Sequence, residues 1–373
     1  MSNHPRKFMV ARAPNAGIGD HLSCVLGAWW YAKRTGRELV IDWRGSRFNP
    51  ELGRNCFFDF FEPIRSIGGV RVIADNSVPD IYSGHQGLYH HKWTADNLVA
   101  FWHVSHTVEE KSHLADLART GRDRPESIVI ANQHLPLPDD QSVLAPALGS
   151  LRFRERFRAR ADAFLGGHTE DHSLAAIHIR HGNGENIGHR VAYWLDPIDL
   201  FRQIRRNAST DIHRPGIHGE FNDNMPPSLT AVRRGTRSER RIYRLVRHWI
   251  EYQRAESGLP LVPVLFTDAE QVVEGLRKEL PDTVHYESSL LPAGKGPLHQ
   301  IASPHTSVDT CNGSNVVEDM FTELEILQRC HRLVCIPSQF TIFRRAGLPP
   351  ERIKMLLPPK VNRLVARFAA KVF

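Results

Sequence analysis

The chain has 373 residues, of which 41% are hydrophobic and 24% charged, which is the usage of a globular protein and excludes a disordered or fibrous one. Its 48 Lys and Arg exceed its 41 Asp and Glu and give a net charge of +7, which favours anionic partners without choosing among them. The five cysteines are odd in number and scattered, which argues against a disulfide-rich secreted scaffold and favours reduced thiols in a cytosol.

The first elements of the chain alternate between strand and helix. Residues 8–13 predict a buried strand, residues 21–34 predict a helix, and residues 39–43 predict a second buried strand. Gly36 follows the helix, where a glycine commonly ends one in the left-handed conformation. Strand, helix and strand within about 35 residues form a βαβ unit, which implies a parallel sheet.

Gly17, Gly19 and Asp20 lie at the start of this first helix, and Asp42 ends the second strand. The arrangement imitates a dinucleotide-binding fingerprint but lacks its third glycine, since position 22 is Leu, so a nicotinamide enzyme is disfavoured. Two interpretations stay open. The turn either packs the helix on the strand or contacts a ligand at the helix N-terminus.

A second alternating block follows a less regular middle. Residues 70–74 predict a third strand, and residues 75–149 predict loops and short helices. The second block contains predicted strands over 174–179, 261–266, 284–286 and 332–336, and predicted helices over 151–165, 269–280 and 315–330. We therefore expect an α/β chain with two Rossmann-like domains. They cover residues 1–166 and 167–350, and a C-terminal segment, 351–373, packs back on the first domain.

Residues 207–257 interrupt the second block as an Arg-rich insertion, and its helical part spans residues 239–254. Such a helix either binds nucleic acid, or is solvated or contacts an anionic surface. Because no nucleic-acid-binding motif accompanies it, a solvated helix or a contact with an anionic surface is favoured. We expect no nucleic-acid partner and a peripheral contact with an anionic membrane face. The longest apolar stretch, residues 22–32, is about half of what a membrane-spanning helix needs.

The strongest chemical signal follows the predicted strand 174–179. A turn there contains Arg180, His181, Asn183 and Glu185. Ligands of open α/β sheets bind beyond the carboxyl ends of strands, and the planar guanidinium of Arg suits a phosphate. A solvated turn with Arg180 in a surface ion pair is the alternative.

Other strand ends and loops offer polar side chains with weaker signals. Thr267 and Asp268 fit either a helix cap or a ligand contact, and Ser338 and Thr341 fit either a plain helix cap or a phosphate site. On pattern alone Asp319 is a solvated acid on an amphipathic helix. His299 lies in a Gly-Pro-Leu-His loop that would otherwise be interpreted as a turn.

Several strings taken together resemble one family. They are Gly17-Ile-Gly-Asp20, Arg34-Thr-Gly-Arg-Glu-Leu-Val-Ile-Asp-Trp-Arg-Gly-Ser46, Phe61-Glu-Pro63, Ile67-Gly-Gly-Val-Arg-Val-Ile73, His178-Ile-Arg-His-Gly-Asn-Gly-Glu185 and Gly296-Pro-Leu-His299. In these strings the chain resembles the α-1,6-fucosyltransferases that include the rhizobial nodulation enzymes. The likeness covers about half of the chain and is weakest over 76–150 and 207–257. The segment Ile336-Pro-Ser-Gln-Phe-Thr341 departs from the family's third motif.

The resemblance implies a GT-B-like fold in which two Rossmann-like domains face a central cleft. It also implies inverting transfer of L-fucose from GDP-β-L-fucose to an N-acetylglucosamine-containing acceptor such as a chitooligosaccharide, without a metal or other cofactor. The alternatives are another GDP-sugar transferred to a lipopolysaccharide or capsule acceptor, and a module that binds a nucleotide sugar or glycan without catalysis. We expect a cytoplasmic protein, peripheral to the inner membrane.

Residue roles follow from the resemblance together with the residues themselves. Arg180 neutralises the departing diphosphate, Glu185 is the candidate base, and His189 is the reserve for that role. The expected donor-binding residues are Arg180, His181, Asn183, Thr267, Asp268, His299, Asp319, Ser338 and Thr341. The expected acceptor-side residues of the first domain are Gly17, Gly19, Asp20, Asp42 and Arg44.

Overall fold

The computed structural model describes residues 6–356 except for a set of excluded stretches. These are residues 14–16, 47, 50, 52, 84–86, 90–92, 100–107, 134, 139, 167–170, 180–236, 268–269, 287–315 and 337. The described residues divide into two compact units. The first comprises those within Met1–Arg160 together with Gln339–Pro349, and the second those within Ala161–Ile301, Val308–Ser338 and Pro350–Phe373.

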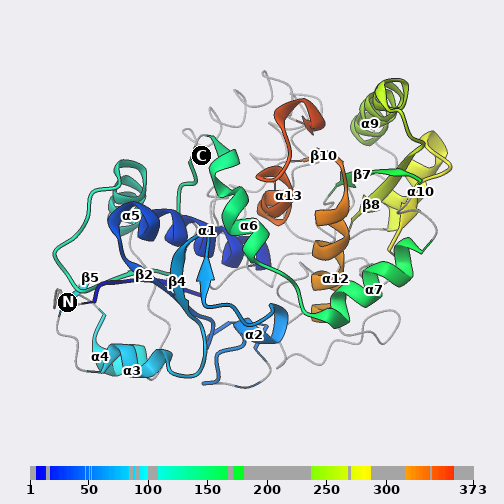
Figure 1. The fold of residues 1–373 in the computed structure, drawn as a ribbon. Coiled ribbons are helices and arrows are strands. Elements are labelled where there is room, and N and C mark those ends of the chain that lie inside the picture. Colours follow the sequence, from blue (N-terminus) through cyan, green and yellow to red (C-terminus); the bar gives the residue numbers. More distant parts are fainter. Residues whose placement is uncertain are drawn as a thin grey trace, which may run out of the picture. The chain divides into compact units, whose positions relative to one another are not determined.

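The first unit is built on a six-stranded sheet in the order β3-β4-β2-β1-β6-β5. Figure 1 labels three of these strands, β2, β4 and β5. Its strands are β1 (Phe8–Arg12), β2 (Glu38–Asp42), β3 (Ser66–Ile67), β4 (Val70–Ile73), β5 (Leu88–Tyr89) and β6 (Ile128–Ala131). Neighbouring strands pair in parallel except for β3 and β4, which form an antiparallel hairpin. Gly68 and Gly69 make its two-residue turn with φ of 50° and 85°, a backbone conformation that glycine adopts without strain.

Helix α1 (Ile18–Thr35) connects β1 to the parallel strand β2 and so confirms the predicted βαβ unit. It starts three residues earlier than the pattern predicts, with Gly17 as its extended N-cap residue. Gly36 ends it at φ 69° and donates its N–H to the carbonyl of Ala32, as predicted for a left-handed cap. Except for the half-buried Asp20 and Trp30, every residue from Ile18 to Ala32 is buried.

The opposite face of this sheet is covered by α3 (Val78–Tyr82) and the segment that leads through Trp93 into α4 (Ala95–Val99). Val78, Tyr82, Trp93 and Leu98 form one apolar cluster with side chains of β1, β2 and β6. The interpretation of residues 75–149 as loops and short helices overlooks β5 and β6, and β6 pairs directly with β1. The remaining helices near this unit are α2 (Phe57–Phe60), α5 (Val108–Thr120), η1 (Gln141–Leu144), α6 (Ala145–Ser150) and α7 (Glu155–Leu165).

The second unit has a five-stranded, fully parallel sheet in the order β11-β10-β7-β8-β9. Its strands are β7 (Ser173–His178), β8 (Leu261–Phe266), β9 (Val284–His285), β10 (Arg332–Cys335) and β11 (Ile353–Met355). Its long helices are α9 (Arg237–Glu256), α10 (Glu270–Glu279) and α12 (Val316–Arg329). From β7 the chain adds β8 and β9 on one side and then β10 and β11 on the other, which makes this a doubly wound sheet.

Helix α9 corrects the interpretation of residues 207–257 as an insertion. It is a helix of the crossover connection between the parallel neighbours β7 and β8. Ile242, Val246 and Ile250 are buried in one cluster with Ile177 and Leu265 of the sheet. The helical part of the segment therefore belongs to the α/β architecture, while residues 207–236 lie outside the described residues.

The carboxyl-terminal region is divided differently from the predicted boundaries. The short helices η5 (Gln339–Thr341) and α13 (Ile342–Arg345) belong to the first unit, where the Phe343 ring lies 6.0 Å from that of Phe153. Residues Pro350–Arg352 form η6, and β11 then returns to the second unit, where it pairs in parallel with β10. The described part of the predicted segment 351–373 thus extends the second sheet, and residues 357–373 lie outside the described residues.

Four cysteines lie in the described residues: Cys24, Cys56, Cys330 and Cys335. All four are buried free thiols, as the sequence predicts for reduced cysteines. Burial raises the pKa of the Cys24 thiol to about 12, so it stays protonated and unreactive. Among the described helices, none is both long and apolar enough to cross a bilayer.

Candidate functional site

The second sheet has its topological switch point between β7 and β10, because the order of the strands reverses there. The two strands pair in parallel register up to His178 and Cys335, and the N–H of Ile336 donates to the carbonyl of His178 at 3.1 Å. Segments that leave the carboxyl ends of strands at such a point flank a crevice in which α/β proteins bind ligands. The segments that follow β7 and β10 therefore start side by side.

Four of the predicted residues belong to the segment after β7. Arg180 comes two positions after His178, and His181, Asn183 and Glu185 follow it. All four lie outside the described residues, as do His189, Asp268 and His299. Their assigned roles stay predictions.

Asp319 lies in the first turn of α12, at the same edge of the second sheet. Its side chain is 1% exposed, so the interpretation as a solvated acid is wrong. The hydroxyl of Tyr286, directly after β9, lies 3.4 Å from its Oδ1, and the ring of Phe164 packs edge-on against Tyr286 at 5.2 Å. A carboxylate held in this way beside strand ends can accept hydrogen bonds from a ligand.

Thr267 follows β8 at the same edge and is buried. The N–H of Ile179, after β7, donates to the carbonyl of Phe266, so the ends of β7 and β8 are joined as well. The ring of His285, the last residue of β9, is buried next to the main chain of Thr267. Burial lowers the pKa of His285 to about 4, with a further contribution from the charge of Arg277, so the imidazole is neutral at physiological pH.

Ser338 and Thr341 are both buried, and they belong to different units. Thr341 precedes α13 but makes no capping hydrogen bond with its side chain, so its predicted role as a plain helix cap is wrong. Helix α13 has only four residues and gives little dipole for a phosphate. Ser338 comes three positions after Cys335, the last residue of the switch-point strand β10, and stays a candidate for ligand contact.

The first sheet has a buried ion cluster at the carboxyl ends of β1 and β2. The Arg44 side chain donates two hydrogen bonds of 2.9 Å to the Asp42 carboxylate, and the hydroxyl of Tyr82 in α3 donates a third to Asp42 Oδ2 at 2.9 Å. Arg12, at the end of β1, approaches the same carboxylate to 3.7 Å and lies over the Trp93 ring at 5.1 Å. The side chains of Asp42 and Arg44 are each 1% exposed, which is far less than an acceptor-contacting pair on an open surface would show.

Protonation in this cluster is decided by competition between burial and charge. Burial raises the pKa of Asp42, but the hydrogen bonds from Arg44 and the charge of Arg12 outweigh it and leave the pKa below its usual value. Burial and the neighbouring carboxylate raise the pKa of Tyr82 well above 10, so its phenol stays a donor. Sequence analysis missed Arg12 and Tyr82, and the signal for Arg12 was a lone charge at the end of an apolar strand.

The carbonyl groups of Gly17 and Gly19, at the glycine turn before α1, contact side chains of α1 itself. His21 places one ring nitrogen 3.1 Å from the carbonyl of Gly17 and the other 3.1 Å from the hydroxyl of Ser46. The hydroxyl of Ser23 donates to the carbonyl of Gly19, which is buried, and Asp20 is half-buried. Of the two open interpretations, these contacts support a turn that packs the helix on the strand.

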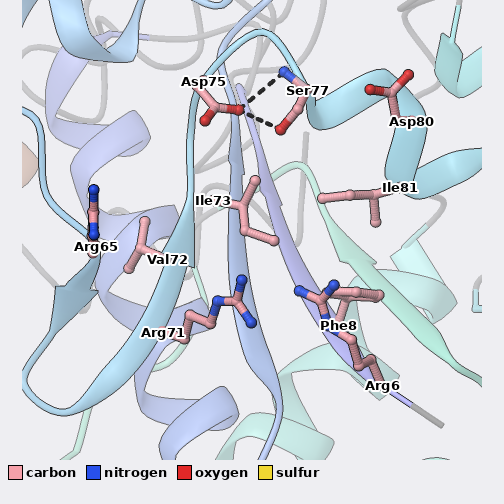
Figure 2. A pocket seen from close by; sticks show the side chains of 10 residues that line it. All are labelled: Arg6, Phe8, Arg65, Arg71, Val72, Ile73, Asp75, Ser77, Asp80 and Ile81. Carbon is pink, nitrogen blue, oxygen red and sulfur yellow. Dashed lines mark hydrogen bonds between the residues drawn. The ribbon is translucent and has the colours of Figure 1, made fainter.

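A hollow of about 570 Å³ lies elsewhere on the first unit, over the amino-terminal end of β1 and beside α3 (Figure 2). Figure 2 shows Arg6, Phe8 and Arg71 at one end and Asp75, Ser77 and Asp80 at the other, with Ile73 and Ile81 between them. The two arginines share Glu38, since Arg6 forms two hydrogen bonds to it and Arg71 lies 3.5 Å away. Glu38, Asp75 and Asp80 together offset the charges of Arg6, Arg71 and the third lining arginine, Arg65, so this hollow is a weaker anion site than a strand-end crevice.

Metal ligation has no candidate in the described part of the chain, where no three His, Cys, Asp or Glu side chains gather closely enough to hold an ion. The metal-independent reaction implied by the resemblance stays a prediction.

Comparison with known proteins identifies the family. The profile of the family named nodulation protein Z (NodZ) matches residues 5–219, more than half of the chain. Nodulation protein Z of Bradyrhizobium diazoefficiens is 29% identical over 346 residues, covering 92% of this chain and 80% of the relative. The Sinorhizobium fredii protein of that name is 26% identical over 348 residues, covering 92% of this chain and 91% of the relative.

The fold agrees with solved structures of the same family. A NodZ α-1,6-fucosyltransferase soaked with GDP-fucose matches with a TM-score of 0.58 and 22% identity, covering 92% of this chain and 93% of that one. The same enzyme co-crystallised with GDP matches with a TM-score of 0.57. This likeness confirms an α/β, GT-B-like fold, whereas the predicted central cleft stays a prediction. The chain belongs to the nodulation protein Z family.

Proposed function

We propose that this protein is a glycosyltransferase that transfers L-fucose from GDP-β-L-fucose to the 6-hydroxyl of an N-acetylglucosamine unit, with a chitooligosaccharide as acceptor. Membership of the family supports the fucosyltransferase activity, since a solved family member was soaked with GDP-fucose and co-crystallised with GDP. The observation on which the proposal mainly rests is the switch point between β7 and β10, with Asp319 buried at the same sheet edge.

The proposed reaction is a single displacement with inversion. The acceptor oxygen bonds to C1 of fucose as the bond from C1 to the β-phosphate oxygen breaks, and the β-linked donor gives an α-linked product. GDP leaves with the electron pair of the broken bond. We assign Arg180 to the charge that grows on this diphosphate, because a guanidinium offers paired donors and keeps its charge at any working pH.

The proton of the acceptor hydroxyl needs a base. We assign it to Glu185, with His189 as the alternative, because both follow β7 in the same segment. Asp319, Thr267 and Ser338 are assigned to the donor nucleotide, since all three lie at or near strand ends of the sheet that carries the switch point. His181, Asn183, Asp268 and His299 complete the proposed donor contacts. No metal is required in this scheme.

The test combines turnover with a matched pair of variants. Purified protein is incubated with GDP-fucose and chitin oligomers, and released GDP and the mass of the product are measured. Arg180→Ala is expected to lower kcat by roughly 100- to 1,000-fold without changing the melting temperature. Arg119→Ala, an equally drastic change of a 67% exposed arginine on α5, is expected to have no effect on kcat.

Each alternative has its own outcome. A near wild-type rate for Arg180→Ala would refute the assignment of this residue. Tight binding of GDP without turnover on every acceptor would identify a non-catalytic binding module. Turnover with a different GDP-sugar on a lipopolysaccharide or capsule acceptor would overturn the proposed donor and acceptor.

A further inference from the structure

Helix α9 and the turn after it contain the strongly exposed large apolar side chains of the described residues. Among the described residues, three large hydrophobic side chains are strongly exposed: Leu245 at 36%, Tyr252 at 60% and Leu259 at 51%. Leu245 and Tyr252 are seven residues apart and so lie on the same face of α9, two turns from each other. Leu259 lies in the turn that leads from the end of α9 into β8. Single exposed hydrophobic residues are ordinary, but three on one helix and its following turn mark a surface for interaction.

Charged side chains flank this face, and the basic ones are in excess. Arg240, Arg241 and Arg244 are exposed, as are the acids Glu251 and Glu256. Glu251 lies 3.6 Å from Arg247, and Arg244 lies 3.8 Å from Glu279, whereas no ion pair joins Arg240 or Arg241 to another residue within the described ranges. Other arginines of the helix are occupied, since Arg247 pairs with Glu279 at 2.7 Å and Arg254 pairs with Asp282. The helix therefore has two arginines, Arg247 and Arg254, that tie it to the rest of the second unit, and two, Arg240 and Arg241, that face solvent without such a pair, while Arg244 is 64% exposed and lies beside Glu279.

The remaining face of α9 is anchored. Ile242, Val246 and Ile250 are at most 1% exposed and pack into the core of the second sheet. Gln253 accepts a hydrogen bond of 2.6 Å from Arg332 of β10, which fixes the carboxyl end of the helix as well. Figure 1 shows α9 in yellow-green beside α10 in the second unit. The exposed face is thus presented on a rigid support, and binding there does not require the helix to rearrange.

We propose that this α9 surface, defined as Arg240, Arg241, Arg244, Leu245, Tyr252 and Leu259, docks the protein on a bilayer that contains anionic phospholipids. Cationic side chains are attracted by the negative surface potential of such a bilayer. Tyr and Leu side chains gain free energy at the boundary between headgroups and acyl chains, where an aromatic ring with a polar tip is especially suited. The inference does not depend on the reaction proposed above.

Lipid is favoured over the other anionic partner, nucleic acid, by the aliphatic side chains. A phosphate backbone would use the arginines, and bases could stack on Tyr252, but Leu245 and Leu259 would find no apolar partner on a hydrated nucleic acid. A second copy of this chain is disfavoured by charge, because the same exposed arginines would face each other across a twofold interface.

The test measures co-sedimentation of the full-length protein with vesicles. Vesicles of phosphatidylcholine and phosphatidylglycerol in a 7:3 ratio are compared with vesicles of phosphatidylcholine alone. We expect binding to the anionic vesicles that weakens as salt is added, and little binding to the neutral ones. Each arginine near a charged bilayer contributes about a fivefold change in partitioning, so Arg240→Glu/Arg241→Glu is expected to weaken binding by at least 25-fold.

A second variant tests the apolar part, and a matched control tests the charge. Tyr252→Ser/Leu259→Ser is expected to weaken binding roughly tenfold while retaining its salt dependence. The control is Arg119→Glu/Arg152→Glu, which reverses two arginines that are each 67% exposed on the first unit, and it is expected to bind as the wild type does. Both α9 variants change exposed side chains, so circular dichroism and the melting temperature should match those of the wild type.

Four outcomes would overturn the proposal. They are equal binding to neutral and anionic vesicles, binding to neither, and an equal loss of binding in the control variant. The fourth is a concentration-dependent dimer in sedimentation velocity, or retention of a single-stranded oligonucleotide, that disappears with the α9 variants while vesicle binding is absent. That result would assign the α9 surface to a second copy or to nucleic acid.

Discussion

Replacing Asp42 tests whether the polar edge of the first sheet supports the fold or contacts a ligand. Its carboxylate accepts two hydrogen bonds from the Arg44 side chain and one from Tyr82, all of 2.9 Å, and it faces Arg12 at 3.7 Å. In Asp42→Ala two guanidinium groups, each at most 6% exposed, would remain buried without this carboxylate. Breaking a buried ion pair by removing one partner costs about 3 to 5 kcal/mol, and we expect a loss of that size.

The assay is urea unfolding followed by tryptophan fluorescence, because Trp29, Trp43 and Trp93 are all buried in the first unit. Tyr82→Phe removes a single hydrogen bond to a charged acceptor and should cost about 1.5 to 3 kcal/mol, so the argument can be tested even if Asp42→Ala fails to fold. The control, Asp116→Ala, removes an exposed carboxylate that pairs with Arg122 and should cost less than about 1 kcal/mol.

The reasoning would be refuted by a loss below about 1 kcal/mol for Asp42→Ala, equal to that of the control, together with a raised KM for the acceptor. That combination would restore the sequence-based assignment of Asp42 to acceptor binding. A large loss of stability for Asp42→Ala, with an unchanged KM in the milder Tyr82→Phe variant, would support the structural role.

Two further predictions concern His285 and the packing of α1. The pKa of His285 is about 4 in the folded protein and near 6.5 in the unfolded chain. Between these pH values the unfolded chain binds a proton that the folded protein does not, so the free energy of unfolding falls as the pH falls from 6.5 to 4. We expect the free energy of unfolding, measured with urea, to fall by about 2 kcal/mol between pH 7 and pH 5. In His285→Gln this dependence on pH should be weaker, and an unchanged dependence would count against a buried neutral ring. A Cβ on Gly27 of α1 would lie 2.6 Å from Cβ of Leu135, so Gly27→Ala should destabilise the protein by about 1 to 3 kcal/mol. A Cβ on Gly149 of α6 would meet nothing within 4 Å, so Gly149→Ala should stabilise the protein by up to about 1 kcal/mol. Equal effects of the two substitutions on the melting temperature would contradict this difference in packing.

Local patterns predicted the elements that have a clear period or a long apolar run. The first βαβ unit, the strands around residues 174–179 and 261–266 and the helix of residues 315–330 are recovered to within a few residues. Strands β3, β5, β6 and β11 were missed. Short length alone does not explain this, since β4 and β10 also have only four residues and were predicted. Strands β5 and β6 lie in the segment with an irregular pattern. The order of strands could not be derived from local patterns, since it depends on pairing between segments far apart in the chain, such as β1 with β6.

Burial explains why the candidate residues were interpreted less well than the fold. Asp319 was interpreted on pattern alone as a solvated acid of an amphipathic helix, yet every residue from Asp319 to Leu327 is buried. A helix buried on all sides has no solvent face, so a charged residue on it must be satisfied internally or by a ligand. Asp42 and Arg44 were assigned to an acceptor side because they lie at the end of the second strand of the first domain, but Tyr82 of the irregular middle region covers them. Neither result is visible from the spacing of residues.

The two sheets use their carboxyl edges in different ways, and this difference decides where a diphosphate is best placed. In the first sheet the Asp42 carboxylate accepts hydrogen bonds from Arg44 and Tyr82 in a buried cluster that holds β2 to α3. The charges of Asp42 and Arg44 are therefore balanced within the fold. In the second sheet the described residues at the edge are mostly hydroxyl groups and an acid, Thr267, Asp319 and Ser338, which can orient a sugar or a base but cannot neutralise a phosphate. A donor bound at that edge therefore needs a cation from a connecting segment. Arg180 is the first cationic residue after β7 at the switch point, and this is the physical reason for choosing it as the residue to test.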